Sequence, residues 1–242
     1  MMEYQERFYR SKINSPDWVS FTIQVKESDL WVRARKDLSA EGYELVFQYR
    51  HLLETYISQR PEFKESLQPL ALDPLAPPIV QAMLQAGLIA QVGPMAAVAG
   101  AMAQFVGQDL LAISKDIIIE NGGDLFIVCN ESLTIGIYAG KSPLSQRLGI
   151  QLAPSSTPIG LCTSSGTVGH SLSFGQADAV TILSPSAVLS DAVATAVGNR
   201  VQTKKDIQLA LDWAQQIPQV EGVLIIIGDQ IGVWGGLELV TL

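Results

Sequence analysis

Cysteine and histidine are nearly absent from this sequence, which holds two of each among 242 residues. Cys129 and Cys162 are too few for the disulfide framework of a small secreted domain, and both lie among apolar or small residues. The sequence also lacks any Cys/His spacing typical of a zinc site. We therefore expect reduced thiols and a cytoplasmic location.

Basic residues are also scarce, because 16 lysines and arginines stand against 24 acidic residues, for a net charge of −8. Such a surface repels phosphates, which excludes nucleic acid and anionic membranes as partners. The first ten residues are charged from the third position and do not form a signal peptide. The stretch 84–105 is interrupted by Gln85, Gln91 and Pro94, so a buried helix is predicted there, with no membrane span.

Hydrophobic periodicity predicts an alternation of strands and helices along the chain. Strands are expected at 4–9, 18–26, 30–35, 117–119, 125–129, 133–139, 158–163, 179–183, 223–227 and 231–240. Helices are expected at 39–58, 79–86, 95–111, 187–197 and 204–216, with a proline-rich connector at 60–78. The strands at 18–26 and 30–35, at 125–129 and 133–139, and at 223–227 and 231–240 are expected to form hairpins.

The two halves of the chain show the same order of elements: two strands, helices, then two strands. The match is clearest where N-G-G-D-L-F-I-V in the first half corresponds to Q-V-E-G-V-L-I-I-I in the second. We infer an α+β fold, a duplicated two-layer unit of antiparallel sheets backed by helices. Residues 1–142 and 143–242, approximately, would form two repeats of a single domain.

One helical segment offers ligands for a cation. Asp191 and Thr195 are four residues apart, which places a carboxylate and a hydroxyl on the same helical face. Together with a main-chain oxygen and water, such a pair suits Mg²⁺, which prefers oxygen ligands. The alternative is structural, with Ser190 or Asp191 capping the helix.

The second candidate is the small-residue loop that contains His170, which follows T-S-S-G-T-V-G. A histidine there could act as a general acid or base or bind a phosphate oxygen, or it could be an ordinary hydrogen-bonded loop residue. Cys162 precedes this loop, and a cysteine nucleophile with His170 as its base is a further alternative. His51 precedes Leu52 and Leu53 on a predicted helix and is interpreted as structural.

A glycine turn supplies the third candidate. In Asn121-Gly122-Gly123-Asp124 the glycines permit positive φ and close approach of a ligand, and Asp124 could bind a hydroxyl or a base edge. An ordinary hairpin turn explains the same residues. The stretch from Gly136 to Ser142 fails the spacing of a phosphate loop, but Lys141 within it could contact an anion.

The order and spacing of four motifs resemble those of the ApbE-type FAD:protein FMN transferases. These motifs are G-P-M-A-A-V-A-G-A, N-G-G-D, T-S-S-G…G-H-S and S-D-A-V-A-T-A. More specifically, the chain is similar to an uncharacterised, ApbE-related family, over about residues 90–240. The resemblance implies an ApbE-like, T-fold-like duplicated fold, in agreement with the repeat inferred above.

The resemblance also implies roles for individual residues. A Mg²⁺ ion would be bound by Asp191, Thr195 and a main-chain oxygen from 96–99, taken as that of Ala97. His170 and Asp191 would be the catalytic residues, with FAD as the nucleotide. The residues implied in cofactor binding are Gly122, Gly123, Asp124, Lys141, Ser164, Ser165, Gly166 and His170.

The reaction implied is transfer of FMN from FAD to a hydroxyl of an acceptor protein, or cleavage of the FAD pyrophosphate. A non-catalytic ligand-binding or scaffold protein that retains the fold is the alternative. Two family features differ here: the Lys-Gly-Tyr of the Ala/Gly-rich helix is replaced by Val98-Ala99-Gly100, and no methionine-glycine-threonine strand is evident in residues 1–35. The expected partners are a flavin or nucleotide and an acceptor protein, and a homo-oligomer is compatible with the sequence.

Overall fold

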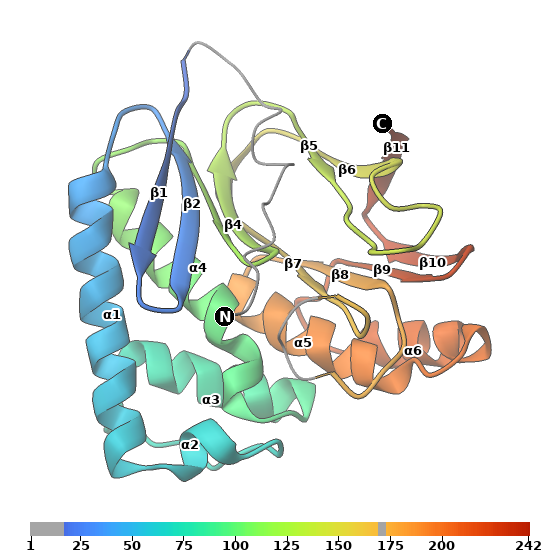
Figure 1. Cartoon of the computed structure of the whole chain (residues 1–242), viewed down its shortest axis with the longest axis horizontal. Helices are drawn as coiled ribbons and strands as arrows, with labels where there is room; N and C mark the ends of the chain where they lie inside the picture. Colours follow the sequence, from blue (N-terminus) through green and yellow to red (C-terminus); the bar gives the residue numbers. More distant parts are fainter. Residues whose placement is uncertain (1–16, 169–172) are drawn as a thin grey trace.

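A computed structural model describes residues 17–168 and 173–242. The strand predicted at 4–9 and the histidine His170 lie outside these residues. Within them, the chain folds into two antiparallel sheets and a layer of helices (Figure 1).

The larger sheet has eight strands in the order β1-β2-β3-β4-β7-β8-β9-β10, and every neighbouring pair is antiparallel. The strands are β1 (Val19–Val25), β2 (Ser28–Ala34), β3 (Ile117–Asn121), β4 (Asp124–Cys129), β7 (Ser155–Ser164), β8 (Ala179–Ser184), β9 (Gly222–Ile227) and β10 (Gln230–Gly235). Strands adjacent in this sheet follow one another in the chain, so no parallel crossover is needed. The predicted α+β class with antiparallel sheets backed by helices is confirmed.

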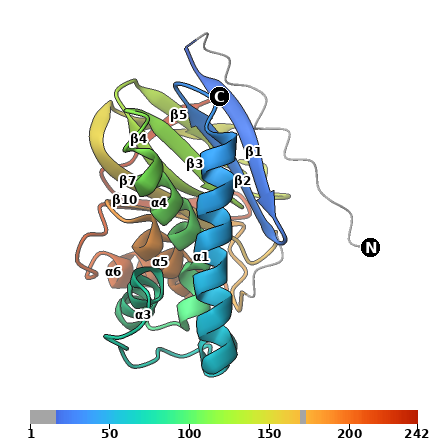
Figure 2. The same cartoon turned by 90° about the vertical axis from the view of Figure 1, so that its left-hand side faces the viewer.

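Helices cover one face of this sheet. They are α1 (Ser39–Gln59), α2 (Glu62–Glu65), α3 (Pro78–Ala90), α4 (Val98–Leu110), α5 (Ala187–Arg200) and α6 (Ile207–Ala214), with 3₁₀ turns η2 (Pro94–Ala97) and η3 (Lys204–Asp206). Helix α1 packs along β1, α4 lies on β3 and β4, and α5 lies on β7 and β8 (Figure 2). The two central helices, α4 and α5, therefore lie over the middle of the sheet and contact each other.

The opposite face of the large sheet is also buried, against a three-stranded sheet in the order β11-β6-β5. Its strands are β5 (Leu133–Gly136), β6 (Leu148–Leu152) and β11 (Glu238–Thr241). In β4, Phe126 belongs to the core on the helix side, whereas Ile127 belongs to the core on the small-sheet side. Because both faces are covered, the central strands are apolar almost throughout instead of alternating with polar residues.

The hairpin predicted between 125–129 and 133–139 is wrong. Strand β4 pairs with β3 and β7, and β5 pairs with β6 in the small sheet. The glycine turn joins β3 directly to β4, with φ of 72° at Gly122 and 118° at Gly123, and β7 occupies the other edge of β4, so no edge is left for β5. The predicted strand 231–240 is likewise divided, because β10 ends at Gly235 and β11 joins the small sheet.

Several predicted helix ends also shift. Helix α3 continues through Gly87 to Ala90, and α5 continues through Gly198 to Arg200, so neither glycine ends its helix. The predicted helix 95–111 begins as the 3₁₀ turn η2. In the described ranges, no single helix is long and apolar enough to cross a membrane; only α3 and Pro94–Leu110 together reach that composition, and they are bent by 106°.

Gly100 in α4 and Gly198 in α5 differ in the space around them. A Cβ atom on Gly100 would overlap the Ala187 carbonyl oxygen and lie 2.8 Å from the Cβ of Asp191. A Cβ atom on Gly198 would meet its nearest neighbour at 3.9 Å. Gly100 therefore sets how closely the two helices approach, whereas Gly198 has room for a side chain.

Gly100→Ala should lower the free energy of unfolding by about 1–3 kcal/mol, because the added methyl group separates α4 from α5. Gly198→Ala is the matched control, and it should be neutral or stabilising by up to about 1 kcal/mol because alanine is the better helix former. Urea unfolding of both variants measures this difference. Equal destabilisation of the two variants would contradict the close helix contact.

Candidate functional site

The glycine turn places Asp124 at the start of β4, facing the helices. Alternate residues of a strand share a face, so Asp124 lies on the side of Phe126, which is in the helix-side core. Asp124 pairs across the sheet with Cys162 of β7, and the Thr163 amide donates to the Gly123 carbonyl at 3.2 Å. The turn and the end of β7 are therefore joined beneath the two central helices.

Asp191 projects from α5 toward the first turn of α4. Its Oδ2 accepts a hydrogen bond from the Gly100 amide at 2.9 Å, and the side chain is almost fully buried. The N-cap of α4 is Ala97, which has no side chain able to accept from these amides. Asp191 thus caps a helix other than its own, at the end where the helix dipole favours a negative charge.

Asp191 is close enough to Asp124 for its charge to affect the ionisation of Asp124. Burial raises the pKa of Asp124 well above its usual value, and the negative charge of Asp191 raises it further. Burial raises the pKa of Asp191 to about 7, against an opposing effect of the Gly100 and Ala99 amides. Within the described part of the chain, Oδ1 of Asp124 is buried without a hydrogen-bond partner. A proton or a cation would relieve this excess of buried negative charge.

Cys162 completes the buried cluster as a neutral thiol. Its Sγ donates to the Ala187 carbonyl at 3.3 Å. Burial raises the pKa of Cys162 well above its usual value, and the charges of Asp124 and Asp191 raise it further. Because the thiolate is the nucleophilic form, this environment argues against the cysteine-nucleophile alternative.

Two further residues adjoin the cluster. Thr195 follows Asp191 by one turn of α5 and is partly exposed, on the same helical face as predicted from the spacing. Asn121 was not among the predicted site residues, yet its Nδ2 donates to the Ala99 carbonyl at 3.2 Å and ties the glycine turn to α4. Ala97 lies buried in η2, and its carbonyl as a cation ligand remains a prediction.

Residues 165–168, which directly follow β7, form a compact turn. The Ser165 hydroxyl accepts from the amides of Thr167 at 3.1 Å and Val168 at 3.0 Å. A Cβ atom on Gly140 would lie 2.6 Å from Val168, so the segment that contains Lys141 packs beside this turn. The structure thus brings Lys141 close to the predicted loop, although no polar contact between them is described.

Ser164 and Gly166 connect the same turn to its surroundings. A Cβ atom on Gly198 of α5 would have Ser164 Oγ as its nearest neighbour, which places Ser164 beside the C-terminal half of that helix. The Gly166 amide donates to the Ala177 carbonyl at 2.9 Å and closes the loop between β7 and β8. The loop and the carboxylate cluster therefore flank the same helix.

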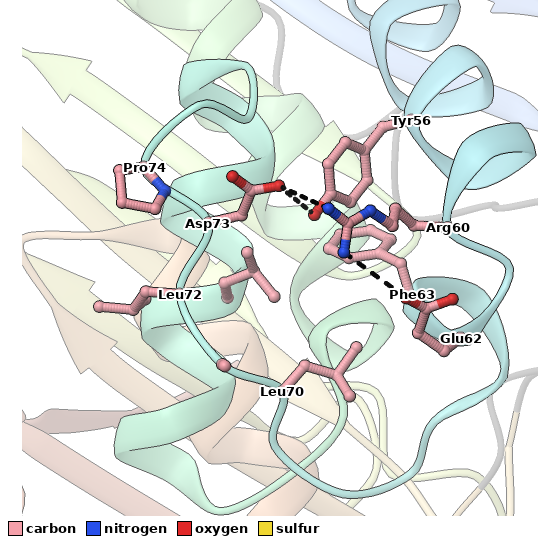
Figure 3. A pocket seen from close by; sticks show the side chains of 10 residues that line it. Tyr56, Arg60, Glu62, Phe63, Leu70, Leu72, Asp73 and Pro74 are labelled. Atoms are coloured by element: carbon pink, nitrogen blue, oxygen red, sulfur yellow. Dashed lines mark hydrogen bonds and ion pairs between the residues drawn. The ribbon is translucent and has the colours of Figure 1, made fainter.

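Two surface cavities lie elsewhere, between α1 and the connector that precedes α3. One, of about 380 Å³, is lined by Tyr56, Arg60 and Asp73, with Tyr56 Oη donating to Asp73 at 3.1 Å (Figure 3). The other, of about 360 Å³, adjoins it and includes His51. None of the described residues predicted for the site lines either cavity, so these cavities do not support the proposed site.

The donor atoms fit a hard cation better than a zinc-type ion. Among the described residues, no three His, Cys, Asp or Glu side chains converge on one point, which is the arrangement a transition metal commonly uses. The cluster instead offers the orphaned oxygen of Asp124 and the buried carboxylate of Asp191, with the Thr195 hydroxyl one turn away. Oxygen ligands completed by water are those that Mg²⁺ prefers.

Acidification should stabilise the protein between pH 8 and 5.5 when divalent cations are removed with EDTA. The folded-state pKa of Asp191 is raised from 3.8 to about 7, so the folded state binds the extra proton and stability falls as pH rises through this range. From pH 5.5 to 7 the effect is about 2 kcal/mol, or about 4–8 °C in Tm. Thermal denaturation measures it, and a Tm that rises with pH across this window would contradict the buried pair.

Comparison with known proteins identifies the family. The model of a family described as "AbpE bacteria" matches residues 10–232. The chain belongs to this family. A curated relative named "UPF0280 protein" from Methanocella arvoryzae is 38% identical over 219 residues, covering 90% of this chain and 89% of the relative. The resemblance to an uncharacterised ApbE-related family is thereby confirmed.

Solved ApbE structures share the fold of this family member. The flavin transferase ApbE from Vibrio cholerae is 13% identical, with a TM-score of 0.56, and the match covers 90% of this chain and 96% of that one. The ApbE protein from Thermotoga maritima is 12% identical, with a TM-score of 0.57, over 89% and 96% of the two chains. At this identity the likeness establishes the fold alone, and the residues of the site must carry the functional argument.

Proposed function

We propose that the protein binds FAD, or a closely related nucleotide, together with Mg²⁺ at the cluster of Asp124 and Asp191, and cleaves the pyrophosphate of that nucleotide. The observation that carries the proposal is the pair of buried carboxylates, one of which has an orphaned oxygen. A buried carboxylate oxygen without a hydrogen-bond partner is destabilising, and a bound cation would compensate for it. The ApbE-like fold supports a flavin nucleotide as the ligand.

Each part of the proposed site has a separate role. Asp124, Asp191 and Thr195 would hold the cation, which when bound neutralises charge on the phosphates. Gly122 and Gly123 carry no side chains and leave the turn open to a ligand. Lys141 lies on the segment beside the Ser165 turn and would attract the anionic nucleotide.

The proposed reaction is a phosphoryl-group transfer. A hydroxyl oxygen of an acceptor protein or of water bonds to the FMN phosphorus, and the bond from that phosphorus to the bridging oxygen breaks. AMP leaves with the bridging oxygen, and the hydroxyl proton passes to a base. The products are the FMN phosphoester or free FMN, plus AMP. Because such reactions depend mainly on positioning and charge neutralisation, a rigid cluster of oxygen donors suits this chemistry.

A non-catalytic flavin-binding protein is the second candidate. The observation that favours it is the replacement of the lysine-containing motif of the transferases by Val98-Ala99-Gly100 at the start of α4. In this chain the Gly100 amide donates to Asp191, so the N-terminal end of α4 binds a carboxylate of the cluster. A protein of this kind would bind the nucleotide and release no AMP.

One experiment tests both candidates. The purified protein is incubated with FAD, FMN, ADP or NAD, with Mg²⁺ or with EDTA, while Tm and AMP release are recorded. The proposal predicts a Tm increase with FAD that depends on Mg²⁺, since binding to the folded state stabilises it, and AMP release under the same conditions. A Tm increase without AMP release favours the binding protein. Indifference of both readouts to FAD and Mg²⁺ would overturn the proposal.

A further inference from the structure

An aromatic ring is displayed beside the proposed site, in the loop between β7 and β8. Phe174 is 55% exposed, although burial of a phenylalanine side chain is normally favourable. It precedes Gly175, which is buried. Phe174 therefore presents an apolar ring to solvent next to a buried glycine.

The backbone around Phe174 is held firmly. Its amide donates to Oδ1 of Asn199 at 2.9 Å, and its carbonyl accepts from Nε2 of Gln202 at 2.6 Å. Two residues later, the Gln176 amide donates to the Val201 carbonyl at 2.8 Å. Three hydrogen bonds thus fix the backbone of residues 174–176 to the C-terminal end of α5 and the residues after it. The backbone that carries the ring is therefore held in a defined place.

Glycine contacts connect this place to the predicted cofactor loop after β7 and to α5. A Cβ atom on Gly166 would overlap the carbonyl of Gly175, and a Cβ atom on Gly175 would overlap the carbonyl of Gly198. The backbone next to Phe174 therefore lies directly between the predicted cofactor loop and α5. Gly198 is seven residues beyond Asp191, about 10 Å along the helix axis. A nucleotide whose phosphates lie near Asp191 and whose ring points toward Gly198 would reach Phe174.

We propose that Phe174 is a stacking platform for the aromatic ring system of the nucleotide bound at the carboxylate cluster. This inference rests on the proposed function. Rings stack on aromatic side chains through their faces, and an exposed phenylalanine on a fixed backbone provides such a face. FAD carries two ring systems, the isoalloxazine and the adenine, and either one could occupy the platform.

The test compares ligands that have a ring with one that has none. Equilibrium binding of FAD, FMN, AMP and inorganic pyrophosphate is measured in the presence of Mg²⁺ for the wild-type protein and for Phe174→Ala and Phe174→Leu. Both variants should bind FAD about fivefold to a hundredfold more weakly, with pyrophosphate affinity unchanged. Phe174→Trp should retain FAD affinity. Of FMN and AMP, the ligand that loses more affinity between the wild type and Phe174→Ala identifies which ring is stacked.

Phe47→Ala is the matched control, since Phe47 is also 55% exposed but lies on α1. It should leave FAD affinity unchanged. Equal FAD affinity of Phe174→Ala and the wild type, in a protein that binds FAD, would overturn this inference alone. An equal loss of pyrophosphate affinity would also overturn it, because the loop would then have moved. Absence of FAD binding by the wild-type protein would overturn the proposed function as well.

Discussion

Asp191→Asn should reduce Mg²⁺-dependent AMP release from FAD by at least about a hundredfold while the protein stays folded. The asparagine keeps an oxygen that can accept from the Gly100 amide, so the cap on α4 is retained. It removes the negative charge that a cation would need. Because the carboxylate is buried, its neutralisation should leave Tm at pH 8 equal to or above that of the wild type. Chromatographic measurement of AMP, with Tm in parallel, separates the two effects.

Two companion variants make this result interpretable. Asp191→Ala removes the charge and the cap together, so it should lose activity and also about 1 kcal/mol of stability relative to Asp191→Asn. Asp212→Asn changes a carboxylate on α6, outside the cluster, and should keep wild-type activity. If Asp191 serves only as a helix cap, Asp191→Asn will release AMP at the wild-type rate. That outcome would refute its role as a cation ligand.

Asp124→Asn should raise Tm by several degrees at pH 8 in EDTA and abolish the stabilisation by FAD and Mg²⁺. Burial and the charge of Asp191 both raise the pKa of Asp124, so ionisation of this side chain opposes folding. A neutral amide of the same shape removes the repulsion, and each 1 kcal/mol gained is worth about 2–4 °C. The advantage should shrink as the pH falls, because protonation of the wild-type carboxyl group removes the same charge.

Asp116 provides a control, because its substitution should have the opposite effect on stability. Asp116 and Asp124 have the same exposed fraction, 7%, but Asp116 lies nearer the surface, pairs with Arg35 at 2.8 Å and accepts from the Asn130 amide. These contacts hold the pKa of Asp116 below its usual value despite its burial. Asp116→Asn should therefore destabilise the protein at pH 8. A destabilised Asp124→Asn variant would show that Asp124 is satisfied in the folded protein and has no need of a cation.

The sequence allowed much of the helical layer to be predicted, because local patterns determine it. The small-residue run after Pro94 and the Ser186-to-Arg200 segment both form the expected helices, although the glycine in the second does not end it. Gly198 fails as a stop signal because α5 is buried on nearly all sides, and tertiary packing overrides the weak preference of one glycine. Local propensity predicts where a helix lies better than where it ends.

Strand pairing was harder to predict, because it depends on contacts between distant residues. Strands β5, β6 and β11 join from separate parts of the chain to cover the second face of the large sheet. No local pattern indicates that β5 pairs with β6 instead of β4. The continuous apolar character of β4 was the available signal, since a strand buried on both faces requires a second covering layer.

The site was predicted in part. The spacing of Asp191 and Thr195 placed both residues on one helical face, and the glycine turn was recognised with Asp124 at its end. The sequence did not reveal that the charge of Asp191 acts on the carboxyl group of Asp124, because α5 and β4 are brought together only by the fold. The sequence also did not reveal that Asp191 caps α4. Ala97 has no side chain that could cap this helix, and the residue that replaces it comes from another helix, α5.

The most direct test of the central claim is an anomalous difference map from crystals grown with Mn²⁺ and FAD, in which Mn²⁺ replaces Mg²⁺. The account predicts one strong peak with the carboxylate oxygens of Asp124 and Asp191 at about 2.1–2.2 Å and flavin density beside it. A map with bound FAD and no peak at these two carboxylates, or with the metal and flavin at the cavities beside α1, would contradict the account.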